Sequence, residues 1–251
     1  MSSFSVPKTL GVIGGMGPLA TQLYLKKVIE STDASCDQEH IPMIILNHCT
    51  MPDRTAAILG NYAEEVFSLL LQDARFLQQH HADFIAIPCN TSHYFVDRLQ
   101  DEIDIPIIHM LRETVTSIKK RGARRVGILA TDGTLQTAIY QKEMRRQGIE
   151  PVAPSPAAQQ CVMDIIYRDI KKGQPGNPLT FQVIDKELKD YGCDAAILAC
   201  TELSCFGEQQ KLGDFYVDAM DVLVEKTIEY CGAKRRSVKH GASAVSNSAI
   251  Y

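Results

Sequence analysis

Two cysteines, Cys89 and Cys200, lie in closely similar sequence settings. FIAIPCNTSH surrounds the first and AAILACTELS surrounds the second, so each follows an apolar, strand-like run and precedes hydroxyl or amide residues. A cysteine that enters a helix N-terminus has its thiolate stabilised by the helix dipole and by free N–H groups. A lone buried cysteine is usually just a small apolar residue. The matched pair instead predicts two thiols facing one substrate, one taking a proton from a carbon and the other returning one.

Polar side chains follow each cysteine directly. Asn90, Thr91 and Thr201 supply amide and hydroxyl groups suited to a carboxylate. The same residue types also cap helix N-termini, and a helix N-terminus is itself an anion site, so the two roles are compatible. Glu202 has two open roles, an acceptor for a substrate ammonium or a partner of the neighbouring backbone.

The loop GVIGGMGP near the N-terminus suggests a ligand-binding turn. Its glycine spacing does not complete G-x-G-x-x-G, so the dinucleotide signal is weak. The glycines are interpreted as letting the backbone approach either a small ligand, with Met16 closing over it, or the other lobe. Arg54, in MPDRT, follows the next expected strand and could form a bidentate pair with a carboxylate, although an arginine in a polar loop is usually only solvated.

The two halves of the chain repeat one another. Gly11 and Gly127 are 116 positions apart in matching segments, and Cys89 and Cys200 are 111 positions apart. Self-similarity at a nearly fixed interval indicates a duplicated supersecondary unit. The same pairing extends to Gly17 and Gly133, Leu19 and Leu135, Thr21 and Thr137, Tyr24 and Tyr140, and Asp83 and Asp194.

Strands and helices alternate in both halves. Apolar runs predict strands, and apolar residues at helical spacing predict helices, one of which ends at Gly192 as a C-cap. Such alternation predicts a parallel sheet covered on both faces, with ligands beyond the carboxyl ends of the strands. The expected strands are 9–13, 41–46, 83–88, 126–130, 150–153 and 194–199, with IPII (105–108) closing the first half, and the expected helices include 61–81 and one carrying Phe181, Ile184, Leu188 and Tyr191.

Composition narrows the class of protein. The net charge of −4 argues against a protein that binds nucleic acid, because such proteins usually carry an excess of basic residues. No apolar run reaches the ~18 residues that a membrane-spanning helix needs. The N-terminal segment MSSFSVPKTL does not resemble a signal peptide. We expect a cytoplasmic protein whose thiols stay reduced. No C-x-x-C pair or His-x-x-x-His pair occurs in the sequence, which disfavours a zinc site. The remaining cysteines are interpreted as structural or incidental: Cys36, Cys49, Cys161, Cys193, Cys205 and Cys231.

Five motifs occur in an order that resembles the aspartate/glutamate racemase family: GVIGGMGPLAT, MPDRT, PCNTSH, IIYRDIKKG and LACTELS. The resemblance runs from about Leu10 to about Glu229. The first loop carries Gly14, Gly15 and Met16, and Glu202 follows Thr201, so the chain is similar to the branch of aspartate and broader amino-acid racemases rather than to glutamate racemases. The family implies an α/β fold of two similar doubly wound parallel-sheet lobes, related by pseudo-twofold duplication, with an active site in the cleft between them.

The resemblance also implies functions for particular residues. Cys89 and Cys200 become the catalytic pair, no cofactor is used, and a homodimer is expected. Arg54 and a lysine would hold the side-chain carboxylate of the substrate, with Lys171 favoured over Lys172. The expected substrate-binding residues are Met16, Arg54, Asn90, Thr91, Thr131, Lys171, Thr201 and Glu202.

The function predicted is racemisation of aspartate or glutamate by two cysteine bases. A carboxylate held by Asn90, Thr91 and Thr201 could accept the charge that develops when the weakly acidic α-proton leaves. Alternatives within the same scaffold are a broad-specificity amino-acid racemase, a hydantoin racemase, a maleate isomerase and an arylmalonate decarboxylase. Outside it remain a binding protein for an acidic metabolite and a redox protein that forms a Cys89–Cys200 disulfide.

The expected domain organisation follows the repeat. Residues 7–112 form the first lobe, completed by a helix at 218–231, and residues 113–217 form the second. Residues 234–251 are basic, then small and polar, and lack helical periodicity, which predicts a flexible tail.

Overall fold

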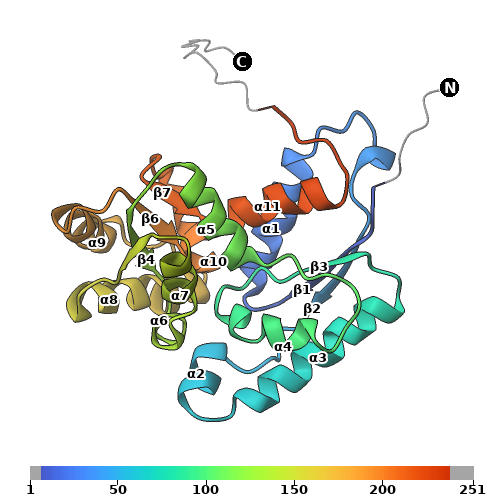
Figure 1. Cartoon of the computed structure of the whole chain (residues 1–251), viewed down its shortest axis with the longest axis horizontal. Coiled ribbons are helices and arrows are strands. Elements are labelled where there is room, and N and C mark those ends of the chain that lie inside the picture. The colour runs from blue at the N-terminus through green and yellow to red at the C-terminus, as the bar shows by residue number, and fades with distance from the viewer. Residues whose placement is uncertain (1–6, 238–251) are drawn as a thin grey trace, which may run out of the picture.

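The computed structural model describes residues 7–237 and contains two parallel β-sheets in two lobes (Figure 1). The first sheet has the strand order β2-β1-β3 and the second has the order β5-β4-β6-β7. All pairings between these strands are parallel, which confirms the predicted α/β class. The strands are β1 (Leu10–Gly14), β2 (Met43–Asn47), β3 (Phe84–Ala86), β4 (Arg125–Leu129), β5 (Glu150–Val152), β6 (Ala195–Leu198) and β7 (Tyr216–Asp218).

Helices alternate with these strands along the chain. In the first half they are α1 (Pro18–Ser31), α2 (Arg54–Leu59), α3 (Ala63–Gln79), α4 (Val96–Gln100) and α5 (Met110–Lys120). In the second half they are α6 (Asp132–Thr137), α7 (Ile139–Arg146), α8 (Pro156–Met163), α9 (Pro178–Asp190), α10 (Thr201–Gln210) and α11 (Ala219–Tyr230). Short 3₁₀ turns lie at Asp37–Glu39, Thr91–Tyr94 and Ile170–Lys172, and a π-helix lies at Asp164–Asp169.

The sequence repeat has a packing cause that the two sheets share. In each half the first strand lies at the centre, between the second and the third. A Cβ added at Gly11 of β1 would lie 2.8 Å from Leu77 of α3, and one at Gly127 of β4 would lie 2.7 Å from Leu188 of α9. Each glycine therefore lets a helix leucine rest directly on the central strand.

The paired aspartates also occupy matching places. Asp83 Oδ2 accepts a hydrogen bond of 2.7 Å from the backbone N–H of Thr9, just before β1. Asp194 Oδ2 accepts bonds of 2.7 and 2.9 Å from the N–H groups of Arg124 and Arg125, where β4 begins. In both halves a carboxylate before the third strand thus satisfies the open donors at the start of the central strand.

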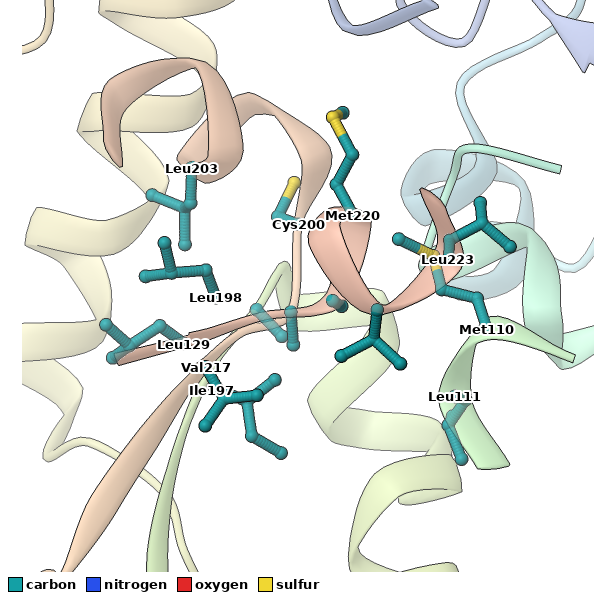
Figure 2. Packing of buried hydrophobic residues seen from close by; sticks show 14 of the residues in the cluster. Met110, Leu111, Leu129, Ile197, Leu198, Cys200, Leu203, Val217, Met220 and Leu223 are labelled. Atoms are coloured by element: carbon teal, nitrogen blue, oxygen red, sulfur yellow. The ribbon is translucent and has the colours of Figure 1, made fainter. Parts of the chain in front are cut away.

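The C-terminal helix α11 joins the two halves of the core. It packs against α1 and α5, and it contacts β3 of the first sheet and β7 of the second. Figure 2 shows Met220 and Leu223 of this helix in one apolar cluster with Met110 of α5 and Leu198 of β6. The other face of the first sheet is covered by α3, whose apolar stripe includes Leu70. The lobe boundaries near residues 112 and 218 remain a prediction, since α5 and α11 serve both halves.

Most expected elements occur within a few residues of their predicted ends. The segment 105–108 contributes one parallel bridge, Ile85 to Ile107, rather than a full strand. Residues 105–108 lie beside β3 in the first sheet, in the same position that β7 has beside β6 in the second sheet. The strand β7 was not predicted. Gly192, with φ of 69°, follows the end of α9 as expected. No helix of residues 7–237 is long and apolar enough to cross a membrane.

The first residues of the predicted C-terminal tail make backbone and side-chain contacts with the rest of the chain. Asp33 donates a 2.8 Å backbone hydrogen bond to Lys234, and Arg236 donates one of 2.7 Å to Ser31. Arg235 also forms an ion pair of 2.6 Å with Glu225 of α11. Residues 234–236 are therefore paired with the end of α1, whereas the rest of the predicted tail, 238–251, lies outside the described residues.

Candidate active site

The third strand of each half delivers one of the matched cysteines. Cys89 follows the end of β3 by three residues, and Cys200 follows the end of β6 by two and is the N-cap of α10. Both lie beyond the carboxyl ends of their strands, where the fold class predicts ligands to collect. Their exposed fractions are only 6% and 5%.

One narrow cavity is lined by both cysteines. All ten residues predicted for the site line it: Met16, Arg54, Cys89, Asn90, Thr91, Thr131, Lys171, Cys200, Thr201 and Glu202. Asp53, Thr55 and Tyr167 line it too and were not predicted.

The two cysteines differ in their charged neighbours. The Cys200 thiol donates a hydrogen bond of 2.9 Å to Glu202 Oε2. Burial raises the pKa of this thiol well above its ordinary value, the Glu202 carboxylate raises it further, and Lys171 acts in the opposite direction. Cys200 therefore keeps its proton in this arrangement.

Arg54 lies on the Cys89 side of the cavity, at the start of α2. Burial alone would lower the pKa of its guanidinium, but the neighbouring Cys89 sulfur and Asp53 outweigh burial and raise it. Its Nη1 donates to the carbonyl of Pro52 at 2.9 Å, and its Nη2 donates to the carbonyl of Met16 at 3.2 Å. Arg54 is therefore not a solvated loop residue but a buried cation fixed by backbone oxygens.

Neutral hydrogen bonds fix the polar side chains after Cys89. Tyr140 donates a 2.6 Å bond to Asn90 Oδ1, which turns the Asn90 amide nitrogen away from that hydroxyl. The hydroxyl of Thr91 lies 3.0 Å from that of Thr131 and 3.0 Å from that of Thr134. Residues of the second half thus orient residues of the first.

Three buried polar atoms of the cavity lack a hydrogen-bond partner among residues 7–237: Arg54 Nε, Asn90 Nδ2 and Glu202 Oε1. Leaving a buried polar atom unpaired costs about 1–3 kcal/mol, so such atoms are uncommon and call for an explanation. Two of the three are donors and one is an acceptor carboxylate. A ligand that carries both a carboxylate and an ammonium would complement this set.

A charged group at the edge of the cavity joins the two halves of the chain. Lys171 Nζ lies 2.9 Å from Asp53 Oδ2, and the Tyr167 hydroxyl donates to both Asp53 oxygens, at 3.2 and 3.1 Å. Lys171 also lies over the Tyr167 ring, 4.2 Å from its centre. Lys171 rather than Lys172 is the one of the two lysines among the lining residues of the described chain.

His93 contacts the backbone at Cys89 and holds it in place. Its Nδ1 is 2.9 Å from the carbonyl of Cys89, and its Nε2 accepts a 3.1 Å bond from the N–H of Met110. Burial lowers the pKa of His93 to about 3, with nearby His109 acting in the same direction. The ring is therefore neutral and carries its proton on Nδ1. No group of three or more potential metal ligands is found within residues 7–237.

A family model described as Asp/Glu/Hydantoin racemase matches residues 13–227. The chain belongs to this racemase family. The broad specificity amino-acid racemase RacX of Bacillus subtilis (strain 168) is 29% identical over 227 residues, which cover 87% of this chain and 96% of RacX. The family resemblance drawn from the five motifs is therefore confirmed, and the chain is an isomerase.

Solved structures give the same result for the fold. Picrophilus torridus aspartate racemase superposes with a TM-score of 0.77 at 26% identity, covering 91% of this chain and 96% of that one. An aspartate racemase homologue from Pyrococcus horikoshii OT3 gives a TM-score of 0.73 at 27% identity, covering 90% and 99%. The two-lobed parallel-sheet architecture is thus shared over nearly the whole of each chain.

Proposed function

We propose that this protein racemises an acidic amino acid, aspartate or glutamate, without a cofactor, using Cys89 and Cys200 as opposed bases. The observation that carries the proposal is one small buried cavity into which matching strand ends of the two halves bring both cysteines. One sulfur, as thiolate, removes the α-proton. The other, as thiol, gives a proton to the opposite face of the same carbon, and the two roles exchange in the reverse reaction.

The charge of the cavity supports an acidic substrate. Arg54 and Lys171 supply two cations, and Glu202 supplies a carboxylate with one unpartnered oxygen. A carboxylate near Asn90, Thr91 and the N-terminus of α10 would meet donors able to stabilise the negative charge that develops on proton removal. Because the lining residues are largely buried, these interactions act away from bulk water, where they are stronger.

The proposal is tested by exchange in deuterated water. Purified protein is incubated without added cofactor with L-aspartate, L-glutamate or L-alanine, and deuterium at the α-carbon and optical rotation are followed together. We expect aspartate or glutamate to gain deuterium while losing rotation, at least ~10-fold faster than alanine. Failure of all three to exchange would contradict the proposal.

A second candidate is a racemase of broad specificity. The similarity to RacX over most of both chains favours it, because that relative is described as a broad specificity enzyme. It predicts that alanine exchanges at a rate comparable to that of the acidic substrates. The expectations of a cytoplasmic location and a homodimer belong to the same proposal, and the dimer is tested by measuring mass in solution by light scattering.

A further inference from the structure

A second, more open cavity of about 440 Å³ adjoins the inner one. The two cavities share five lining residues: Met16, Asp53, Arg54, Lys171 and Glu202. Among these, the side chains of Asp53 and Lys171 are 32% and 25% exposed, whereas Met16, Arg54 and Glu202 are each at most 7% exposed. The Asp53–Lys171 ion pair therefore lies at the mouth of the inner cavity, facing the outer one.

Asp53 is held from both halves of the chain. From its own half, its Oδ1 accepts a 2.9 Å hydrogen bond from the N–H of Ala56 as the N-cap of α2. From the other half, Lys171 and the hydroxyl of Tyr167 donate hydrogen bonds to the second oxygen, Oδ2. Burial would raise the pKa of Asp53, but Lys171, the Ala56 N–H and Arg54 together lower it, so the carboxylate is ionised.

The inner cavity is lined by one more anionic side chain than is needed to pair with the charged groups of an acidic amino acid. Such a substrate has two carboxylates and one ammonium, which match the two cations Arg54 and Lys171 and the anion Glu202. Asp53 has no counterpart in this matching. Its carboxylate instead occupies Lys171, the cation expected to receive one carboxylate of the substrate.

We propose that the Asp53 carboxylate is a resident substitute for the side-chain carboxylate of the substrate and that it sets specificity by competing for Lys171. This inference rests on the proposed function. A substrate with a second carboxylate replaces Asp53 on Lys171, and Asp53 turns toward the outer cavity, where its exposed side allows hydration. A neutral amino acid cannot replace it, so Lys171 stays paired with Asp53.

The test uses Asp53→Asn, which removes the charge but keeps a side-chain oxygen for the Ala56 N–H, because asparagine is also a favoured N-cap. Binding of succinate and glutarate, each with two carboxylates, and of propionate, with one, is measured by calorimetry in the wild type and the variant. We expect the variant to bind succinate or glutarate ~5- to 10-fold more tightly, corresponding to loss of a partly exposed ion pair. Propionate binding should change less than ~2-fold.

Three controls make the result specific. Glu64→Gln removes the same charge from the ion pair with Arg98, outside both cavities, and should leave dicarboxylate binding unchanged. Adding Lys171→Met to Asp53→Asn should cancel the gain. Asp53→Ala, which also loses the helix cap, reports through its melting temperature how much of any effect comes from folding.

Equal or weaker dicarboxylate binding by Asp53→Asn would overturn the inference, because Asp53 would then only orient Lys171. This outcome is distinct from failure of the proposed function, which is seen as absence of α-deuterium exchange by the wild type. In an active enzyme, the KM for aspartate or glutamate should fall with Asp53→Asn while the KM for alanine does not.

Discussion

The Cys200 thiol donates a hydrogen bond of 2.9 Å to Oε2 of Glu202, which lies two residues further along the chain in the first turn of α10. The other oxygen of that carboxylate has no partner among the described residues. One carboxylate thus faces the cysteine with one oxygen and leaves the other for a donor in the cavity. Cys89 has the Arg54 guanidinium as its charged neighbour instead. The two matched thiols are therefore surrounded by opposite charges.

Replacing Glu202 by Gln should lower the pKa of the Cys200 thiol. The amide has nearly the same shape but no negative charge to oppose the thiolate, so alkylation by iodoacetamide should begin at lower pH. Peptide mass spectrometry at a series of pH values measures this for Cys200 alone. Glu208→Gln, on the same helix and paired with Lys27, is the matched control. Identical profiles for the two variants would show that Glu202 does not control the thiol.

Replacing either Cys89 or Cys200 by Ala should lower the rate of racemisation by ~10³-fold or more, since a positioned acid or base contributes roughly 10²–10⁴-fold. Loss of optical rotation measures the rate, and circular dichroism checks the fold. Cys36→Ala, at an exposed position, should behave as the wild type. Near-normal racemisation by either single variant would refute the two-thiol mechanism.

Tyr140→Phe should reduce stability and weaken substrate binding together. The variant leaves buried Asn90 Oδ1 without its 2.6 Å donor and frees the amide to rotate. The free energy of unfolding in urea should fall by about 1–3 kcal/mol, and KM should rise more than kcat falls. Tyr94→Phe, at a 42% exposed tyrosine, should change stability by no more than ~0.5 kcal/mol. An unchanged KM in Tyr140→Phe would remove Tyr140 from the positioning of Asn90.

The buried neutral His93 should make the protein sensitive to acid. Its pKa is about 3 when folded, against an ordinary value of 6.5, so below pH 6.5 the unfolded chain gains a proton that the folded chain does not. This contribution to stability is complete above pH 6.5 and is lost as the pH falls. Between pH 6.5 and 5 the loss should be about 2 kcal/mol.

Urea unfolding of the wild type and of His93→Gln at pH 7 and pH 5 measures this contribution. The variant should be less stable at pH 7 but should lose less stability on acidification. His109, whose pKa burial lowers to about 4, acts in the same direction and remains in both proteins. Equal losses in the two proteins would mean that His93 is not the acid-sensitive group.

The residues that the sequence could place in the cavity are those that follow strands or belong to recurrent motifs. The repeat relates Cys89 to Cys200, and in each sheet the parallel strands end at one edge, so each cysteine could be predicted at the ligand-binding edge of its own sheet. That the two edges share one cavity was expected only from the likeness of the two cysteine segments and from the family resemblance, because β3 and β6 belong to different sheets. Lys171 and Lys172 could not be separated, because adjacent residues of a 3₁₀ turn point about 120° apart and packing decides which one faces the cavity.

Asp53 and Tyr167 show why other lining residues were missed. Their contact joins residues 114 positions apart, and no local pattern specifies it. The available signals were the position of Asp53 beside Arg54 and that of Tyr167 four residues before Lys171. The second signal is weakened because the chain passes from a π-helix into a 3₁₀ turn between Tyr167 and Lys171, so regular helical spacing does not hold.

Strand β7 was missed for a different reason: it has three residues, too few for an alternating pattern.

Thermodynamics limits how differently the enzyme can treat the two enantiomers, despite the unequal surroundings of Cys89 and Cys200. Mirror-image amino acids have the same free energy in water, so a racemase must have the same kcat/KM for both enantiomers. Arg54 beside one sulfur and Glu202 beside the other can therefore make the two enantiomers differ only in how that common ratio divides into kcat and KM. The enantiomer that is bound more tightly must be turned over more slowly, by the same factor.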